Sequence, residues 1–222
     1  MANHIKLLAI DLAKNVYQLH GVEEQGKPVY RKPLSRKQFI EFMANLPRCT
    51  VAMEACATSN YWGRKFQSLG HTVQLISPQH VKPFVRGNKT DRNDAKAIAT
   101  AALQPGMPTV PVKTIEQQDI HLIHRIRERL ISQRTGLSNQ IRGFLMEYGV
   151  FLKPGLSQLQ DIPFLLEDAE NELSPIAREE IQGLYEEFKA VDKKVLAYDK
   201  KIVHICKSHA LCQRFMKLPG VG

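Results

Sequence analysis

The sequence predicts an α/β domain with a mixed sheet, followed by an all-α region. Short strand-like segments alternate with helical ones up to about residue 105. A cluster of three prolines then interrupts the pattern, and beyond it apolar residues recur at helical spacing. We therefore expect an α/β domain at residues 1–105, a linker at 106–113 and a helical coiled-coil region at 114–217.

The elements of the first domain follow from local patterns. Residues 5–33 hold three strand-like segments separated by turn residues, which is typical of an antiparallel meander. Ser35 is a suitable N-cap for the helix that follows, and Gly70 is expected to end a helix that begins at about Ser59. The remaining expected elements are strands at 49–53 and 71–76, a short helix at 78–87 and a helix at 90–103. This order is that of an RNase H-like (RuvC-like) domain, in which an antiparallel three-strand edge joins parallel strands.

Charge and composition indicate an anionic partner. The chain has 31 basic and 22 acidic residues, a formal net charge of +9 and a pI of about 9.4. Residues 1–113 hold the whole positive excess, which favours nucleic acid, although solubility and local helix pairing are the alternative explanation. No apolar run is long enough to span a membrane. Four cysteines without a CxxC pair indicate reduced thiols in a cytoplasmic protein.

The helical region carries two long apolar stripes. In the first, at residues 115–148, Ile123, Leu130 and Leu137 are seven residues apart. The second alternates steps of four and three residues, which is typical of a coiled coil or helical hairpin, with an ordinary amphipathic bundle helix as the alternative. Residues 150–175 contain several prolines and are expected to form an irregular connection. The second stripe consists of Leu184, Phe188, Val191, Val195, Tyr198, Ile202 and Ile205.

Four acidic residues fall where an RNase H-like domain carries its carboxylates. Asp11 ends the first strand and Glu54 ends the fourth. Asp91 and Asp94 lie at i and i+3 on one helix, so that both face the same way. Carboxylate oxygens suit Mg²⁺, with Mn²⁺ as an alternative, and two such ions promote phosphoryl transfer. These four residues are the candidate catalytic and metal-binding set, although each alone could be structural, at a strand end or in the acidic first turn of a helix.

Basic residues near the acidic set are candidates for phosphate contacts. Each such contact would add to affinity and to its salt dependence. Arginines on the first long helix could line a nucleic-acid groove, but for Arg127 and Arg134 the alternative is salt bridging between helices. The candidate nucleic-acid-binding residues are Lys14, Lys82, Arg86, Lys89, Arg92, Arg125 and Arg129.

Three short segments resemble the motifs of the insertion-sequence DEDD transposases, the group that includes Piv-type DNA invertases and RNA-guided bridge recombinases. They are Ala9–Lys14 (AIDLAK), Ala52–Ala55 (AMEA) and Lys89–Ala95 (KTDRNDA), of which the third is the most specific. The resemblance implies a RuvC-like DEDD domain, a coiled-coil region and a cytoplasmic location in a bacterium or archaeon. It also implies DNA as substrate, a guide RNA from the element as partner, and a homodimer or higher oligomer formed through the helical region.

The sequence departs from this family at its C-terminal end. Family members continue into a second catalytic domain, which opens with Leu-Pro-Gly-Val-Gly and supplies a serine thought to be the nucleophile. This sequence ends at Leu218–Gly222, which would be the start of that domain or of a helix-hairpin-helix, or else a simple loop broken by Pro and Gly. The expectation is thus a truncated transposase that is inactive alone in complete recombination.

Two other functions remain open from the sequence. The first is an RNase H-like structure-selective DNA endonuclease of the junction-resolvase type, which would work without a serine. The second is a non-catalytic nucleic-acid-binding truncated transposase. Metal-dependent cleavage of branched DNA would favour the first, and nucleic-acid binding without cleavage in any metal would favour the second.

Overall fold

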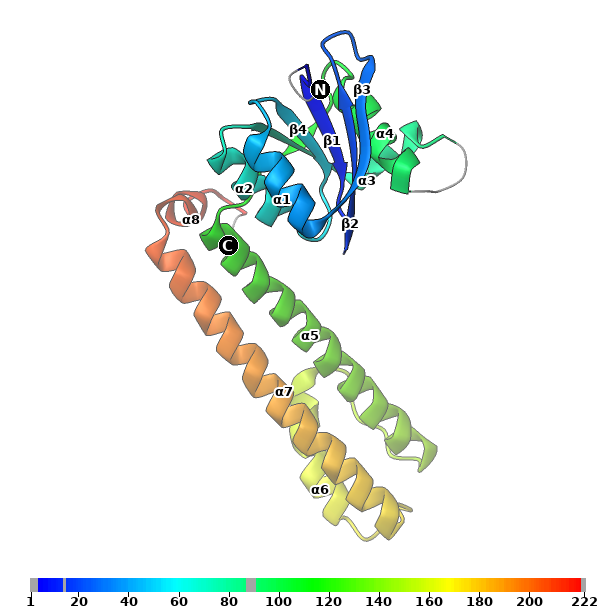
Figure 1. Ribbon diagram of the computed structural model, residues 1–222. Coiled ribbons are helices and arrows are strands. Elements are labelled where there is room, and N and C mark those ends of the chain that lie inside the picture. Colours follow the sequence, from blue (N-terminus) through cyan, green and yellow to red (C-terminus); the bar gives the residue numbers. More distant parts are fainter. Residues whose placement is uncertain (1–3, 14, 87–90, 221–222) are drawn as a thin grey trace. The chain divides into compact units, whose positions relative to one another are not determined.

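The computed structural model describes residues 4–13, 15–86 and 91–220, with the side chains of Asp91 and Arg92 outside the described part. It divides into two compact units, residues 1–117 and 118–222. The first unit is the α/β domain, and the second is built from helices (Figure 1). The predicted class of α/β followed by all-α is therefore confirmed in outline.

A six-stranded mixed sheet forms the centre of the first unit. Its strand order is β3-β2-β1-β4-β5-β6. β1 pairs antiparallel with β2 and parallel with β4, and β4 pairs parallel with β5. The predicted meander joined to parallel strands is thus present, and the order is compatible with an RNase H-like fold. The strands are β1 (Leu7–Asp11), β2 (Val16–Val22), β3 (Pro28–Ser35), β4 (Thr50–Glu54), β5 (Thr72–Ile76) and β6 (Thr109–Val110).

Helices cover both faces of this sheet. α1 (Arg36–Asn45) and α2 (Ser59–Ser68) pack on one face, and α4 (Asp91–Ala102) packs on the other. The short α3 (Pro78–Val81) and the 3₁₀ turn η1 (Lys82–Phe84) lead toward α4. This three-layer arrangement gives each strand of the sheet centre two buried faces, which is why β1 and β4 are almost continuously apolar up to their last residues.

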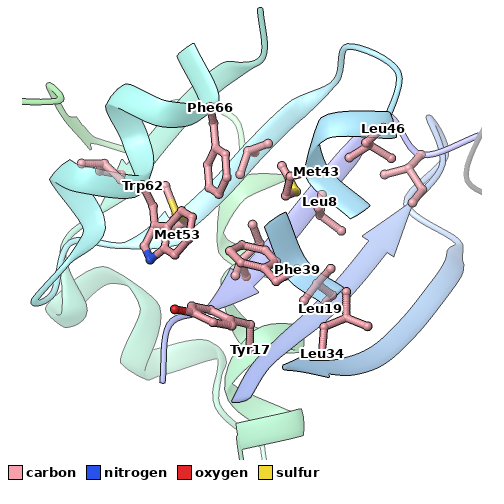
Figure 2. Packing of buried hydrophobic residues seen from close by; sticks show 14 residues of the cluster. Leu8, Tyr17, Leu19, Leu34, Phe39, Met43, Leu46, Met53, Trp62 and Phe66 are labelled. Atoms are coloured by element: carbon pink, nitrogen blue, oxygen red, sulfur yellow. The ribbon is translucent and has the colours of Figure 1, made fainter. Parts of the chain in front are cut away.

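The core on the α1–α2 face contains a cluster of aromatic rings among aliphatic side chains (Figure 2). The Phe39 ring stacks on Tyr17 at 4.3 Å between centroids and meets the rings of Trp62 and Phe66 edge-on at 5.0 and 5.7 Å. Such arrangements are favoured by the ring quadrupoles in addition to the apolar area that they bury. Ser35 begins α1 with a capping box completed by Gln38, as expected for that position.

The segment 106–113, which we expected to be a linker, lies within the first unit. It contains β6, which pairs antiparallel with β5. Beyond β6 the backbone N–H of Lys113 donates to Asn60 Oδ1 at 2.9 Å, and Val112 packs so closely on Gly63 that a Cβ there would lie 2.9 Å from it. The connection is therefore attached to α2.

Two long helices build the second unit. Most of α5 (Ile115–Glu147) belongs to it, together with α7 (Pro175–Ser208) and the short α8 (Ala210–Phe215). The helices run antiparallel, because Arg127 pairs with Asp199 and Arg134 pairs with Asp192. The salt-bridging alternative for these two arginines is thus confirmed, whereas a supercoil between the helices stays a prediction. No helix in the described part of the chain is long and apolar enough to cross a membrane.

The apolar core of the second unit confirms most of the predicted stripe on α7. Phe188, Val191 and Val195 are buried, with Leu184 and Tyr198 packed beside them. The segment 150–175, expected to be irregular, differs from that expectation because it contains two short helical elements whose residues join the core. These are η2 (Leu156–Asp161) and α6 (Ile162–Glu167).

Candidate carboxylate site

Asp11 and Glu54 end two neighbouring parallel strands. In the β1–β4 register Ile10 lies opposite Met53, so that the two acids follow side by side. Ala9 and Ala52 belong to the core beneath α4. Since side chains two apart on a strand share a face, Asp11 and Glu54 lie on the α4 side of the sheet, at the carboxyl ends of β1 and β4.

Cys56 lies close enough to Glu54 and Asp11 for their charges to affect the pKa of its thiol. Burial raises the pKa of Cys56 above its ordinary value, and the negative charges of Glu54 and then Asp11 raise it further, because each disfavours the thiolate. Cys56 is not among the site residues that the sequence predicts. Its position two residues after a strand-ending carboxylate was the available signal.

A tight turn holds this part of the site. The Ser59 hydroxyl, which is buried, donates to the carbonyl oxygen of Cys56 at 2.8 Å. Thr58 adopts a left-handed backbone with φ 72°, and among the described residues no other non-glycine residue has a positive φ. Strained conformations of this kind concentrate at functional sites. The turn therefore fixes where the chain after Glu54 runs relative to the carboxylates.

Asp94 faces the same space as Glu54. Both line a cavity of about 540 Å³, together with Lys82. Asp94 is placed there because Ala97, Ile98 and Ala101 on the inner side of α4 pack against the sheet. The other residues that line this cavity are Pro78, Gln79, Val81 and Val85.

Part of the predicted set lies outside what the structure describes. For Asp91 and Arg92 the structure describes only the place at the start of α4. Lys14 and Lys89 fall outside the described residues, as does Thr90, where this helix was expected to begin. Among the side chains that are described, no three His, Cys, Asp or Glu residues lie close enough together to hold a metal ion. The structure thus gathers Asp11, Glu54 and Asp94 in one region without forming a closed ligand set.

The predicted basic residues fall into two groups. Lys82 lines the cavity of Glu54 and Asp94, and Arg86 lines an adjoining cavity against α4. Arg125 and Arg129 belong to the second unit, where Arg125 pairs with Glu128 at 3.0 Å and Arg129 donates to Gln133 at 3.3 Å. Of these four residues, only Lys82 lines the cavity that Glu54 and Asp94 share.

The negative charge of Glu54 beside Cys56 is expected to lower the reactivity of its thiol. Cys56 is expected to be alkylated slowly by iodoacetamide at pH 8, and about twofold to fivefold faster in the Glu54→Gln variant, because the amide no longer opposes the thiolate. Peptide mass spectrometry against time measures both rates. Cys49, whose pKa burial raises to about 11, serves as the internal control and should react at an unchanged rate. An unchanged Cys56 rate would mean that Glu54 is not beside it.

Asp11 and Glu54 at the ends of β1 and β4, with Asp94 on α4, follow the order that the resemblance to DEDD transposases leads us to expect. The family comparison agrees with this expectation: the model of the IS110-type DEDD transposases, described as transposase, matches residues 8–150. The chain belongs to this family. The matched range holds the sheet except for Leu7, the first residue of β1, and it includes the candidate carboxylates.

Individual relatives are similar along nearly the entire chain. A transposase for insertion sequence element IS1111A from Coxiella burnetii is 42% identical over 98% of this chain, which spans 60% of that relative. A protein named "Probable family 20 transposase" from Pseudomonas aeruginosa is 38% identical over 99% of this chain, and the chain spans 65% of it. The transposase for insertion sequence element IS1328 from Yersinia enterocolitica is 34% identical, again with 65% of its length spanned.

Proposed function

We propose that the chain acts in the transposition of an insertion sequence, as the part of a transposase that cleaves and exchanges DNA strands with the help of divalent metal ions. The observation that supports this most directly is the cavity shared by Glu54, Asp94 and Lys82, at the carboxyl ends of β1 and β4. It combines acidic side chains for a cation with a basic side chain for a phosphate. Because the chain belongs to a family of transposases, the substrate that we propose for this site is DNA.

The available donors fit magnesium. Asp11, Glu54 and Asp94 offer hard carboxylate oxygens, and Asp91 precedes Asp94 by one helical turn. Bound Mg²⁺ or Mn²⁺ would activate the attacking oxygen and stabilise the leaving one during phosphoryl transfer. The protein's own contribution is to hold these carboxylates on rigid strand ends and one helix, and to place Lys82 where it attracts a phosphate.

Two partners complete the proposal. A guide RNA from the element would be held by the basic face of the first unit and by exposed arginines such as Arg125 on α5. The helical unit would associate with a second copy, since α5 and α7 expose several large apolar side chains along their length. These are Leu122, Phe144, Met146, Ile176, Leu196 and Val203.

The proposal is tested by cleavage of end-labelled DNA. The chain is incubated in Mg²⁺ with a linear duplex, a four-way junction and a single strand of the same sequence, and products are separated on denaturing gels. Nicking of the duplex or single strand that requires metal and is lost in Asp11→Asn is the expected result. Cleavage of the four-way junction alone would contradict the proposal and would indicate a structure-selective endonuclease. Binding of all three DNAs without cleavage in Mg²⁺ or Mn²⁺ would contradict the proposal and would indicate a non-catalytic role in DNA binding.

A further inference from the structure

A second cavity adjoins the carboxylate cavity. It has a volume of about 340 Å³ and mixed polar and apolar walls. Among the described residues, neither the candidate metal ligands Asp11, Glu54 and Asp94 nor the turn at Cys56 contributes to its lining. Its lining residues are Pro83, Phe84, Arg86, Asn93, Lys96 and Thr100.

The helix α4 and the turn η1 contribute residues to both cavities. Asn93, Lys96 and Thr100 are spaced at i, i+3 and i+7, so they form one stripe on α4. Asp94, the residue after Asn93, lines the carboxylate cavity instead. On η1, likewise, Lys82 lines the carboxylate cavity and Phe84 lines the second one. Because residues that follow one another in the sequence line the two cavities, a ligand in the second cavity would lie near a phosphate held at the carboxylates.

The chemistry of the second cavity suits a nucleotide. Arg86 and Lys96 bring two positive charges, and neither forms an ion pair with an acidic residue in the part of the chain that the structure describes. Phe84 contributes an aromatic ring, on which a base of any identity can stack. The volume lies in the range of cavities that hold small ligands. Cationic and aromatic groups together are the usual means of holding a single nucleic-acid strand.

We propose that this cavity binds one unpaired nucleotide of the DNA strand whose neighbouring phosphate lies at the carboxylates. Arg86 and Lys96 contact the phosphate of that nucleotide, and its base stacks against Phe84. The proposal rests on the proposed function of the carboxylate cavity as a DNA-cleaving site. The nucleotide beside the cleaved phosphate would then be held with its base unstacked from its neighbours. This would fix which phosphate of the strand lies at the carboxylates.

The experiment measures binding of the 222-residue chain to a fluorescein-labelled oligo(dT) by anisotropy in EDTA, where metal-dependent cleavage does not occur. Arg86→Gln and Lys96→Gln are each expected to weaken binding about fivefold or more, and to reduce the slope of log affinity against log salt by about 0.7, the value for one lost contact on a single strand. Lys37→Gln is the matched control, since Lys37 is exposed on α1, on the opposite face of the sheet. It should leave affinity and slope unchanged.

A second arm isolates the base contact. The wild-type chain is expected to bind oligo(dT) about fivefold or more tightly than an oligomer of abasic sites. Phe84→Leu should remove most of this preference, because leucine keeps the apolar packing against the core beneath α4 but lacks the ring. Thermal unfolding of Phe84→Leu confirms that the fold is retained.

Three results would overturn the proposal. They are an unchanged affinity in both Arg86→Gln and Lys96→Gln, a preference for oligo(dT) that survives Phe84→Leu, and a preference for oligo(U) over oligo(dT) of tenfold or more, which would assign the cavity to RNA. Failure of the carboxylate proposal is recognised separately, because it would appear as a wild-type chain that does not cleave DNA in Mg²⁺ or Mn²⁺, whereas the binding measurements in EDTA involve neither metal nor cleavage.

Discussion

Replacing Phe39 with alanine is expected to destabilise the first unit by about 3–5 kcal/mol. Phe39 is fully buried, and its ring contacts Tyr17, Trp62 and Phe66 from three directions. The substitution removes these contacts and leaves a cavity between α1 and the sheet, which surrounding rings can fill only in part. Urea unfolding followed by tryptophan fluorescence measures the effect.

The tryptophan signal makes this measurement specific to one unit. Trp62 is the single tryptophan of the chain and lies in contact with Phe39 in the same cluster. Ile40→Ala provides the control, because Ile40 is the next residue of α1 and is half-exposed. It should change the free energy of unfolding by about 0.5 kcal/mol or less. Equal effects of the two substitutions would mean that α1 does not pack with its Phe39 side on the sheet.

Glu54→Gln is expected to reduce metal-dependent DNA cleavage by about a hundredfold or more. Glutamine keeps the size of the side chain and one oxygen, but it removes the negative charge that attracts a divalent cation. Metal stabilisation of the transition state amounts to several kcal/mol, and each 1.4 kcal/mol corresponds to about a tenfold change in rate. Initial rates of nicking at saturating Mg²⁺, and again at tenfold higher Mg²⁺, measure the loss and show whether metal affinity is its cause.

Glu41→Gln is the matched control for this variant. Glu41 lies exposed on α1, on the face of the sheet opposite to α4, so the same chemical change there should leave the rate within twofold of wild type. Should Glu54→Gln also cleave at the wild-type rate, Glu54 would not take part in metal binding, and the assignment of the cavity that it shares with Asp94 would be wrong.

Local sequence patterns were sufficient to predict most of the α/β unit. Alternation and turn residues predict the meander, and Ser35 and Gly70 mark helix ends that the structure confirms within one or two residues. The parallel pairing of β1, β4 and β5 followed only from the order of the elements, since no local pattern encodes which strands are neighbours. β6 was missed because two residues between prolines are too short to show a period.

Proline was misleading in the second unit. Pro163 suggested an irregular connection, yet it lies in the first turn of α6, where a helix tolerates proline because the missing N–H has no partner there in any case.

The sequence predicts the acidic residues of the candidate site, but it does not predict which other residues surround them. Asp11 and Glu54 follow buried strands, and the topology brings the ends of those strands together. The location of Lys82 beside Glu54 depends on how α3 and η1 fold back over the sheet, which no pattern in residues 78–86 reveals. The place of Cys56 likewise depends on the left-handed turn at Thr58, a conformation that threonine rarely adopts.

We propose that Asp11, Glu54, Asp91 and Asp94 form a site for divalent cations. Isothermal titration of the chain with Mn²⁺ tests it most directly, with Asp119→Asn on the exposed part of α5 as the control. The wild-type chain and the control are predicted to bind Mn²⁺ with the same affinity, and the double variant Asp11→Asn, Asp94→Asn is predicted to lose this binding. No Mn²⁺ binding by the wild-type chain, or undiminished binding by the double variant, would contradict the claim.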